Sequence, residues 1–268
     1  MQFAGKGQPL SEAGMKAAAV TLGLDPAEDM PVLWAVLTVE SAGFGFLPDK
    51  RPKILYERHI FHRETGGRFS AQAPDLSQRG GGGYIGGAPE YDRLARAIAL
   101  CKGAGVSELA ALRSASWGLG QVMGFNAIAS GFADAADMAR KMAEGEDQQL
   151  LGMVGFIRSN GLHAQLRARD WTGFARRYNG PSFWQNQYDV KLKAAYEKFS
   201  SGVTRDLRAR TAQAALVYLG YRPGDPDGLV GQNTRNAVAA FRRDEKLPAG
   251  DALDDATYAA LMKKAKLA

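Results

Sequence analysis

The sequence predicts a mainly α-helical protein with two domains: a large helical domain with a small β-hairpin lobe, and a small three-helix C-terminal domain. Three observations support this prediction. Apolar residues recur with helical spacing from residue 90 to 199, residues 44–61 are rich in turn formers, and a small-residue break at 200–202 precedes a compact helical unit. We therefore place the large domain at 1–200 and the small one at 205–268.

The first element to carry chemistry is a predicted helix over residues 30–42. Leu33, Val36, Leu37 and Glu40 follow the i, i+3, i+4, i+7 spacing of one helix face. Partial desolvation and the negative end of the helix dipole both favour the protonated form of a carboxyl group at that position. Glu40 is therefore a candidate general acid, although a Glu in this position is more often an ordinary surface residue.

A turn-rich region follows this helix. Gly43 is well placed as a C-terminal cap, and the turn chemistry of residues 44–61 around the apolar run 54–56 predicts a small hairpin or extended lobe. The six glycines between Pro74 and Pro89 predict a loop. This loop lacks the strand-to-helix context and the following Lys-Ser/Thr of a phosphate-binding loop.

From Glu90 to Phe199 the pattern predicts several short helices around one core. Cys101 shares a helical stripe with Tyr91, Leu94 and Ile98, which favours a core thiol over a nucleophile. Beyond the break, helices are expected near 206–219, 232–245 and 254–265.

Composition limits the possible functions. The net charge of +6, from 34 basic and 28 acidic residues, is spread without a basic patch, so we expect no nucleic-acid binding. No stretch is long and apolar enough for a signal or membrane segment, which predicts synthesis in the cytoplasm and no stable membrane association. The single cysteine excludes an intrachain disulfide, and the three histidines form no metal-ligand set, so we expect no metal and no cofactor.

Three islands in the first 200 residues together resemble the lysozyme-like superfamily. They are similar to the Glu-Ser-x-x-Phe run, the Ser-x-x-Gly-x-x-Gln cleft floor and the Tyr-Asn-Gly loop of goose-type lysozymes and lytic transglycosylases. In this sequence they read Val39-Glu40-Ser41-Ala42-Gly43-Phe44, Ser114-Ala115-Ser116-Trp117-Gly118-Leu119-Gly120-Gln121, and Tyr178-Asn179-Gly180-Pro181.

With the runs at 51–59, 82–84 and 171–181, residues 15–198 more closely resemble the N-acetylmuramidase domain of modular phage endolysins. Residues 205–265 resemble the type 1 peptidoglycan-binding domain, with Gln213, Asp227-Gly228-Leu229-Val230-Gly231 and Phe241 among the matching positions. Arg242 stands where that family usually has Gln, which leaves a detail of ligand contact open.

The resemblance implies hydrolysis of the β-1,4 bond between N-acetylmuramic acid and N-acetylglucosamine, with Glu40 as the acid. Asp49, in the turn, and Glu57, after the apolar run, are the candidates for the second carboxylate that such cleavage usually needs. For each, an ordinary turn or ion-pair role is equally compatible with the sequence.

The remaining members of the three islands are candidate substrate-binding residues. Gln121 offers hydrogen bonds to sugar groups, and Tyr178 and Asn179 offer an aromatic wall and an amide. Trp117 offers a stacking surface, although a buried tryptophan is equally consistent with its position.

Two other activities and a binding-only role compete with this prediction. A lytic transglycosylase would form an anhydro-sugar with one carboxyl, a chitinase would cleave chitin, and a non-enzymatic wall-binding protein would keep both folds. We expect a monomer that binds peptidoglycan, is made in the host cytoplasm and reaches the bacterial cell wall through a holin-type pore. The small domain should raise the local enzyme concentration on the wall, so residues 1–200 alone should stay active on soluble glycan.

Overall fold

A computed structural model describes residues 3–41, 43–203 and 205–267 of the 268-residue chain. Ala42, which belongs to the first motif, lies outside the described residues. So do residues 1–2 of the predicted large domain and residue 268 of the small one. The helices of the large domain are α1 (Glu12–Leu22), α2 (Met30–Glu40), α3 (Arg58–Glu64), α4 (Pro89–Gly103), α5 (Leu109–Arg113), η1 (Gly124–Asn126), α6 (Ala135–Glu144), α7 (Glu146–Ser159), α8 (His163–Ala168), α9 (Trp171–Tyr178), η2 (Phe183–Asn186) and α10 (Tyr188–Ser200).

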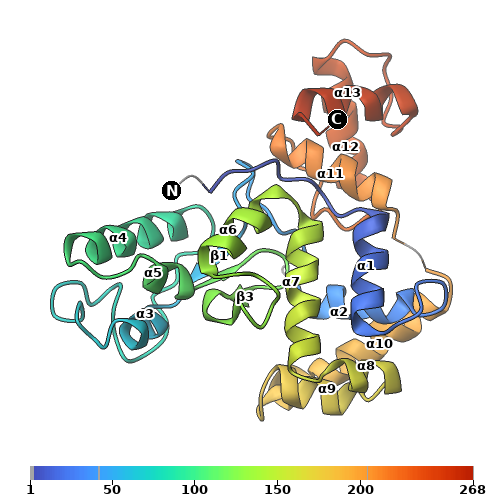
Figure 1. Cartoon of the computed structure of the whole chain (residues 1–268). Helices are drawn as coiled ribbons and strands as arrows, with labels where there is room; N and C mark the ends of the chain where they lie inside the picture. The colour runs from blue at the N-terminus through green and yellow to red at the C-terminus, as the bar shows by residue number, and fades with distance from the viewer. Residues whose placement is uncertain (1–2, 42, 204, 268) are drawn as a thin grey trace.

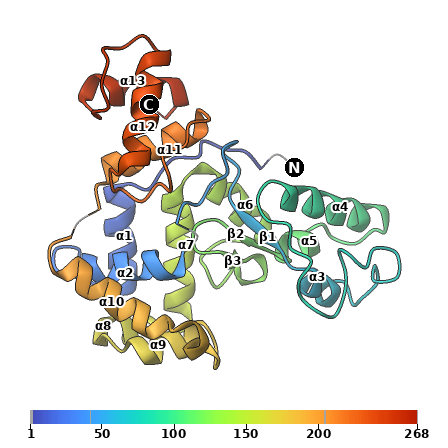
Figure 2. The ribbon, with the colours of Figure 1, turned by 180° about the vertical axis from the view of Figure 1, so that it is seen from behind.

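The large domain divides into two lobes on either side of α7. Figure 1 shows α3, α4 and α5 gathered on one side of α7, with α1, α2 and α8–α10 on the other. Helix α1 packs along α7, and α10 packs along α2. Figure 2 shows the short strands between these two groups of helices.

The sheet differs from the predicted hairpin lobe. Strand β1 (Ile54–Tyr56) pairs antiparallel with β2 (Ala115–Trp117), and β2 pairs with β3 (Val122–Met123). Within residues 44–61 the chain forms an antiparallel bridge between Phe46 and Pro52 and then strand β1, so the expected extended lobe is present, but β1 pairs with β2 and not with a second strand of this region. Residues 115–123 were expected to be helical, but 115–117 and 122–123 are strands, because the glycine-containing turn between them allows the chain to reverse.

Helix α2 ends two residues before the predicted boundary. The hydroxyl of Ser41 donates a hydrogen bond to Leu37 O and accepts one from Gly43 N at 3.1 Å, which fixes the turn beyond Glu40. Gly43 has the left-handed conformation expected of it (φ 75°), but it lies outside the helix cap. The predicted apolar face is confirmed, since Leu33 and Val36 are fully buried.

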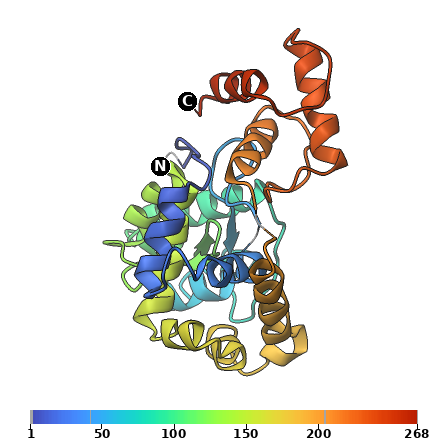
Figure 3. The same cartoon turned by 90° about the vertical axis from the view of Figure 1, so that its right-hand side faces the viewer.

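Helices α11 (Leu207–Tyr218), α12 (Gln232–Asp244) and α13 (Asp255–Ala265) form the separate small domain, called the C-terminal module below. Figure 3 shows it standing at one end of the large domain. Arg242 is buried and donates to the carbonyls of Pro248 and Ala252 and to Asp254 and Thr257. In this chain it therefore holds the turn between α12 and α13.

The C-terminal module packs directly on the large domain. Phe44 and Phe46 form a buried apolar cluster with Ala214, and Tyr218 packs against it. The hydroxyl of Tyr218 donates to Gly7 O at 2.7 Å. The small-residue break at 200–202 therefore joins two domains that share a buried interface.

No helix among the described residues is long and apolar enough to span a bilayer.

Candidate active site

Glu40 lies at the edge of the buried face of α2, where the helix ends. Its side chain is half-buried, while Val36, one turn earlier, is fully buried. The last residue of a helix also faces the negative end of the helix dipole. Position and burial both favour the neutral carboxyl.

Asn179 provides the direct contact to this carboxyl group. It is the C-terminal cap of α9, and its Nδ2 donates to Glu40 Oε1 at 2.9 Å. Two of the three sequence islands, 139 positions apart, therefore meet at one hydrogen bond.

Burial raises the pKa of Glu40, and the hydrogen bond from Asn179 opposes that rise only in part. Tyr178 stacks on Phe174, with ring centroids 5.2 Å apart. Its own pKa is raised by burial and by the negative charge of Glu40, so the phenol stays neutral at ordinary pH. Glu40 therefore faces neutral groups, with no basic partner among its described contacts.

This arrangement suits proton donation. Because the amide of Asn179 binds Oε1, the other oxygen of Glu40 remains to carry a proton toward a reacting group. A carboxyl with a raised pKa keeps that proton closer to neutral pH than an ordinary glutamate does.

Glu57 follows β1 and stands at the N-cap position of α3, where its side chain makes no capping hydrogen bond. Only 14% of its side chain is exposed, and its Oε2 accepts a hydrogen bond from the hydroxyl of Tyr84 at 2.8 Å. The ring nitrogen Nδ1 of His59 lies 3.1 Å from the same oxygen. Tyr84 belongs to the predicted glycine-rich loop, which Arg58 holds through the carbonyls of Gly80 and Gly81.

Asp49 has a different environment. It is exposed in the turn at residues 47–50, and Arg51 Nε donates to its Oδ2 at 2.8 Å. The neighbouring Lys50 donates to Ala265 O of the C-terminal module, so this turn lies against the module.

Gln121 is held almost entirely by the protein. Its Nε2 donates to Gly118 O at 2.8 Å and Lys53 O at 3.3 Å, and its Oε1 accepts from Ser116 Oγ at 2.8 Å. An amide has two N–H donors and two acceptor lone pairs, so one acceptor position remains for a ligand. Gln121 also has φ 46°, a strained conformation for a residue with a side chain, and its internal bonds stabilise the turn there.

Stacking of Trp117 on a sugar is not compatible with the structure. The indole is fully buried, its Nε1 donates to Leu112 O, and Phe3 packs against it with centroids 5.7 Å apart. Its burial agrees with the alternative interpretation of this residue, but Trp117 ends the short strand β2 and does not begin a helix.

A buried ion pair that the sequence analysis did not identify lies behind Glu57. Glu90 is fully buried and accepts bonds from Tyr56 N at 3.1 Å, Ile85 N at 2.7 Å and Arg93 NH1 at 2.8 Å. It thereby joins the end of β1 to the loop that carries Tyr84. The sequence signal was an acid and a base three residues apart in one helix, which is common on exposed helix faces as well.

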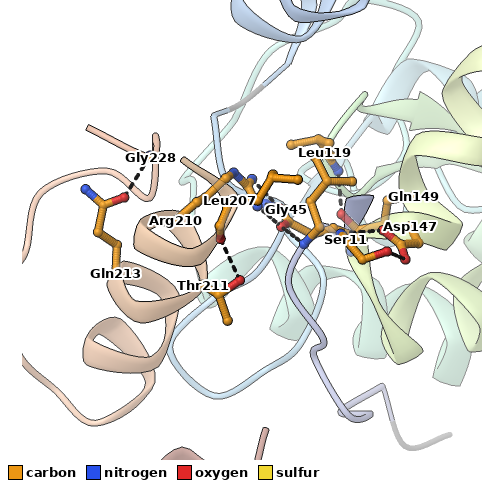
Figure 4. Close-up of polar contacts among 12 residues, drawn as sticks. Ser11, Gly45, Leu119, Asp147, Gln149, Leu207, Arg210, Thr211, Gln213 and Gly228 are labelled. Carbon is orange, nitrogen blue, oxygen red and sulfur yellow. Dashed lines mark hydrogen bonds and ion pairs between the residues drawn. The ribbon is translucent and has the colours of Figure 1, made fainter. Parts of the chain in front are cut away.

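A second buried pair, also missed, lies beyond Glu40. Glu146 is fully buried at the start of α7 and accepts from Leu10 N at 3.0 Å and Gly45 N at 2.9 Å. Both its oxygens bind Arg210 of α11, and Arg210 also donates to Gly43 O at 3.1 Å. Figure 4 shows Arg210 pointing from the module toward Gly45. No sequence pattern links residues that lie 64 positions apart in different domains.

A cavity of about 240 Å³ lies where the end of α2 meets the C-terminal module. Thr38, Ser41 and Gly43 line it from the large domain, and Arg205 and Asp227 line it from the module. Arg210 lines the same cavity, so the segment after Glu40 borders both the open space and the buried ion pair.

Across residues 3–41, 43–203 and 205–267, no group of three or more His, Cys, Asp and Glu side chains is placed to hold a metal ion.

Comparison with known proteins gives a family match for each of the two domains. Residues 29–200 match the N-acetylmuramidase family, and residues 205–261 match a peptidoglycan binding domain family. The crystal structure of the Burkholderia AP3 phage endolysin is similar, with 39% sequence identity and a TM-score of 0.66 over 74% of this chain and 73% of that chain. A search of curated proteins finds no significant match.

Proposed function

Because the chain belongs to the N-acetylmuramidase family and is a muramidase, a glycoside hydrolase that acts on peptidoglycan, we propose that Glu40 is the general acid of its reaction. The observation that carries this proposal is the 2.9 Å hydrogen bond from Asn179 to Glu40, which brings two of the sequence motifs together. Burial raises the pKa of the carboxyl group at this contact. The catalytic role makes the chain an enzyme rather than a protein that only binds the wall.

In the proposed reaction, protonated Glu40 donates its proton to the bridging oxygen of the β-1,4 bond after N-acetylmuramic acid. The bond from the sugar C1 to that oxygen breaks, and C1 develops positive charge. Water then adds to C1 and gives up a proton, which restores the acid over the cycle.

Glu57 is our choice for the second carboxylate. It is largely shielded from solvent, and its described contacts to Tyr84 and His59 leave it without an arginine partner. Asp49 is exposed and bound to Arg51, and its turn contacts the C-terminal module. A carboxylate neutralised by an arginine stabilises positive charge at a sugar C1 less well.

A second carboxylate also favours hydrolysis over the transglycosylase outcome. In a transglycosylase, a hydroxyl of the muramic acid itself attacks C1 and yields an anhydro-sugar. Mass spectrometry of the released fragments distinguishes the two, because the hydrolysis product is heavier by one water molecule. An anhydro end on all products would contradict the proposal.

Substitution tests the acid directly. Glu40→Gln removes the proton donor but keeps the size of the side chain and a hydrogen-bonding partner for Asn179, so we expect turnover to fall by about 10²–10⁴-fold with folding and wall binding retained. The measurement is release of soluble fragments from purified sacculi. Near-normal turnover would end the assignment.

The same assay separates the two candidate carboxylates. Glu57→Gln should lose most of the activity, whereas Asp49→Asn should lose little, because Asp49 contacts Arg51 in an exposed turn. The reverse result would identify Asp49 as the partner of Glu40.

Peptidoglycan is the ligand of the C-terminal module, and the protein acts on the cell wall. We further propose that the chain works as a monomer, does not bind nucleic acid, is made in the host cytoplasm, and reaches the wall through a holin-type pore. The even distribution of its +6 net charge supports the absence of a nucleic-acid surface.

A further inference from the structure

We propose that Arg210, a residue of the C-terminal module, is a positioning residue for cleavage: together with Glu146 it holds the segment that follows Glu40. The proposal rests on the assignment of Glu40 as the acid. It gives the module a part in turnover, in addition to binding the wall.

Glu146 has no access to solvent. A buried carboxylate is stable only when hydrogen bonds and an opposite charge compensate for lost hydration. Leu10 N and Gly45 N supply two hydrogen bonds, and Arg210 supplies the charge. Arg210 is itself buried, with 3% of its surface exposed.

Arg210 then reaches past Glu146 to the segment after the acid. Its NH2 donates to Glu146 Oε1 at 2.8 Å and to Gly43 O at 3.1 Å. Glu146 in turn binds Gly45 N. The ion pair therefore fixes the backbone at Gly43 and Gly45, three and five residues beyond Glu40.

The bonds of Arg210 and Glu146 add to two other restraints on that segment, which are the burial of Phe44 and the hydrogen bond from Lys53 N to Gly45 O at 2.8 Å. A Cβ added at Gly45 would lie 1.8 Å from Gln149 Oε1, so the backbone fits closely on that side. The 240 Å³ cavity borders Ser41 and Gly43, and Arg210 lines it as well. Without Arg210 the segment could move toward this cavity.

A shift of the backbone at Gly43 and Gly45 would be transmitted to Glu40 through Ser41. Ser41 links the segment to the helix, since its hydroxyl binds both Leu37 O and Gly43 N. Glu40 is the last residue of the helix and directly precedes Ser41. A misplacement of about 1 Å in a reacting group can lower turnover about 10²-fold.

The test compares variants of the full chain on soluble, uncrosslinked glycan strands, which removes the need for anchoring to the wall. Arg210→Ala deletes the contacts, and Arg210→Lys keeps the charge but loses the planar fork that binds Glu146 and Gly43 together. Tyr218→Phe is the matched control, because it removes another bond of the same interface, the one to Gly7 O. For each variant, kcat per folded molecule and KM are measured below the unfolding temperature.

We expect kcat about 10–100-fold lower for Arg210→Ala and about 3–10-fold lower for Arg210→Lys, with little change in KM and sacculus binding. Tyr218→Phe should keep the wild-type kcat. If Arg210→Ala does not fold, Arg210→Lys carries the test. The proposal fails if folded Arg210→Lys has the wild-type kcat, or if Tyr218→Phe loses as much.

Glu40→Gln in the same assay separates this proposal from the one it rests on. If Glu40→Gln keeps its turnover, the acid assignment fails whatever the Arg210 variants do. If Glu40→Gln is inactive and Arg210→Lys is normal, only the positioning role of Arg210 fails.

Discussion

Each of the two candidate catalytic carboxylates lies near a buried glutamate–arginine ion pair. One pair lies within a single helix, and the other joins two domains. Behind Glu57, the pair Glu90–Arg93 lies within one helix and binds Tyr56 N at the end of β1. Beyond Glu40, the corresponding pair is Glu146–Arg210, which spans two domains. Both glutamates are fully buried and use backbone N–H groups as well as an arginine.

The two sides of the site therefore obtain their rigidity from different parts of the chain. The Glu57 side is complete within the large domain, because both members of its pair belong to α4. The Glu40 side needs α11 of the C-terminal module. The Glu57 side of the site is therefore held by the large domain alone, whereas the Glu40 side also depends on the C-terminal module.

Removing the C-terminal module should have the largest effect. A chain ending at residue 200 keeps Glu90–Arg93 but leaves Glu146 buried without its arginine and exposes Phe44 and Phe46. The lost partner alone costs about 3–5 kcal/mol of unfolding free energy. We therefore expect the fragment to melt at a much lower temperature and to be poorly active even on soluble glycan, which revises the expectation drawn from the sequence.

Calorimetry and the soluble-glycan assay check this prediction. A fragment 1–200 with the stability and turnover of the full chain would show that the interface contributes only to binding.

Breaking the local pair should come next. Arg93→Ala leaves Glu90 buried without a counter-charge, and we expect a loss of about 3–5 kcal/mol in the full chain. Arg96→Ala, one turn further along α4, breaks the exposed pair with Asp75 and should cost at most about 1 kcal/mol. Urea unfolding measures the free energy of unfolding of both variants, and equal losses of this free energy would contradict the prediction.

Asn179→Ala tests the Glu40 side with a smaller change. Because the amide lowers the pKa of Glu40, its removal should raise that pKa further. Activity needs the protonated acid and is lost as pH rises through its pKa, so the alkaline limb of the kcat profile should move to higher pH. The maximum of kcat should fall about tenfold, from the loss of one orienting hydrogen bond. A limb that moves to lower pH would contradict this assignment.

Tyr84→Phe makes the matching change on the Glu57 side, and it should have the smallest effect. The hydroxyl of Tyr84 donates to Glu57 Oε2 from an exposed loop, so its loss should lower kcat about 2–5-fold without changing stability. Initial rates on soluble glycan measure it. A loss as large as that of Glu57→Gln would mean that Tyr84 itself contacts the substrate.

Sequence reasoning was most successful where a motif lies on one element. The helix that bears Glu40 shows its buried face in the spacing of Leu33, Val36 and Leu37. It was least successful where strands are too short to show a period. Three residues of β2 could not reveal that Trp117 enters the core or that residues 115–117 pair with 54–56.

The parts that the sequence could not predict depend on tertiary placement. Glu146 begins a helix, a position where an acidic residue is usual at the surface, and nothing nearby in sequence marks it as buried. Its partner lies beyond the interdomain break, so only the folded arrangement identifies the pair. For Gln121, the motif predicted hydrogen bonds to the substrate, and the structure shows that most of its hydrogen-bonding groups bind the protein itself.

The arginine that crosses the interface also limits how such enzymes can be recombined. A chimera that replaces α11–α13 with another wall-binding unit needs a guanidinium opposite Glu146 and a small side chain opposite Phe44, where this chain has Ala214. Units that lack both would be joined only by their linker, with an uncompensated carboxylate inside the hydrolase. Lysin engineering by domain exchange should therefore transplant these two positions together with the new specificity.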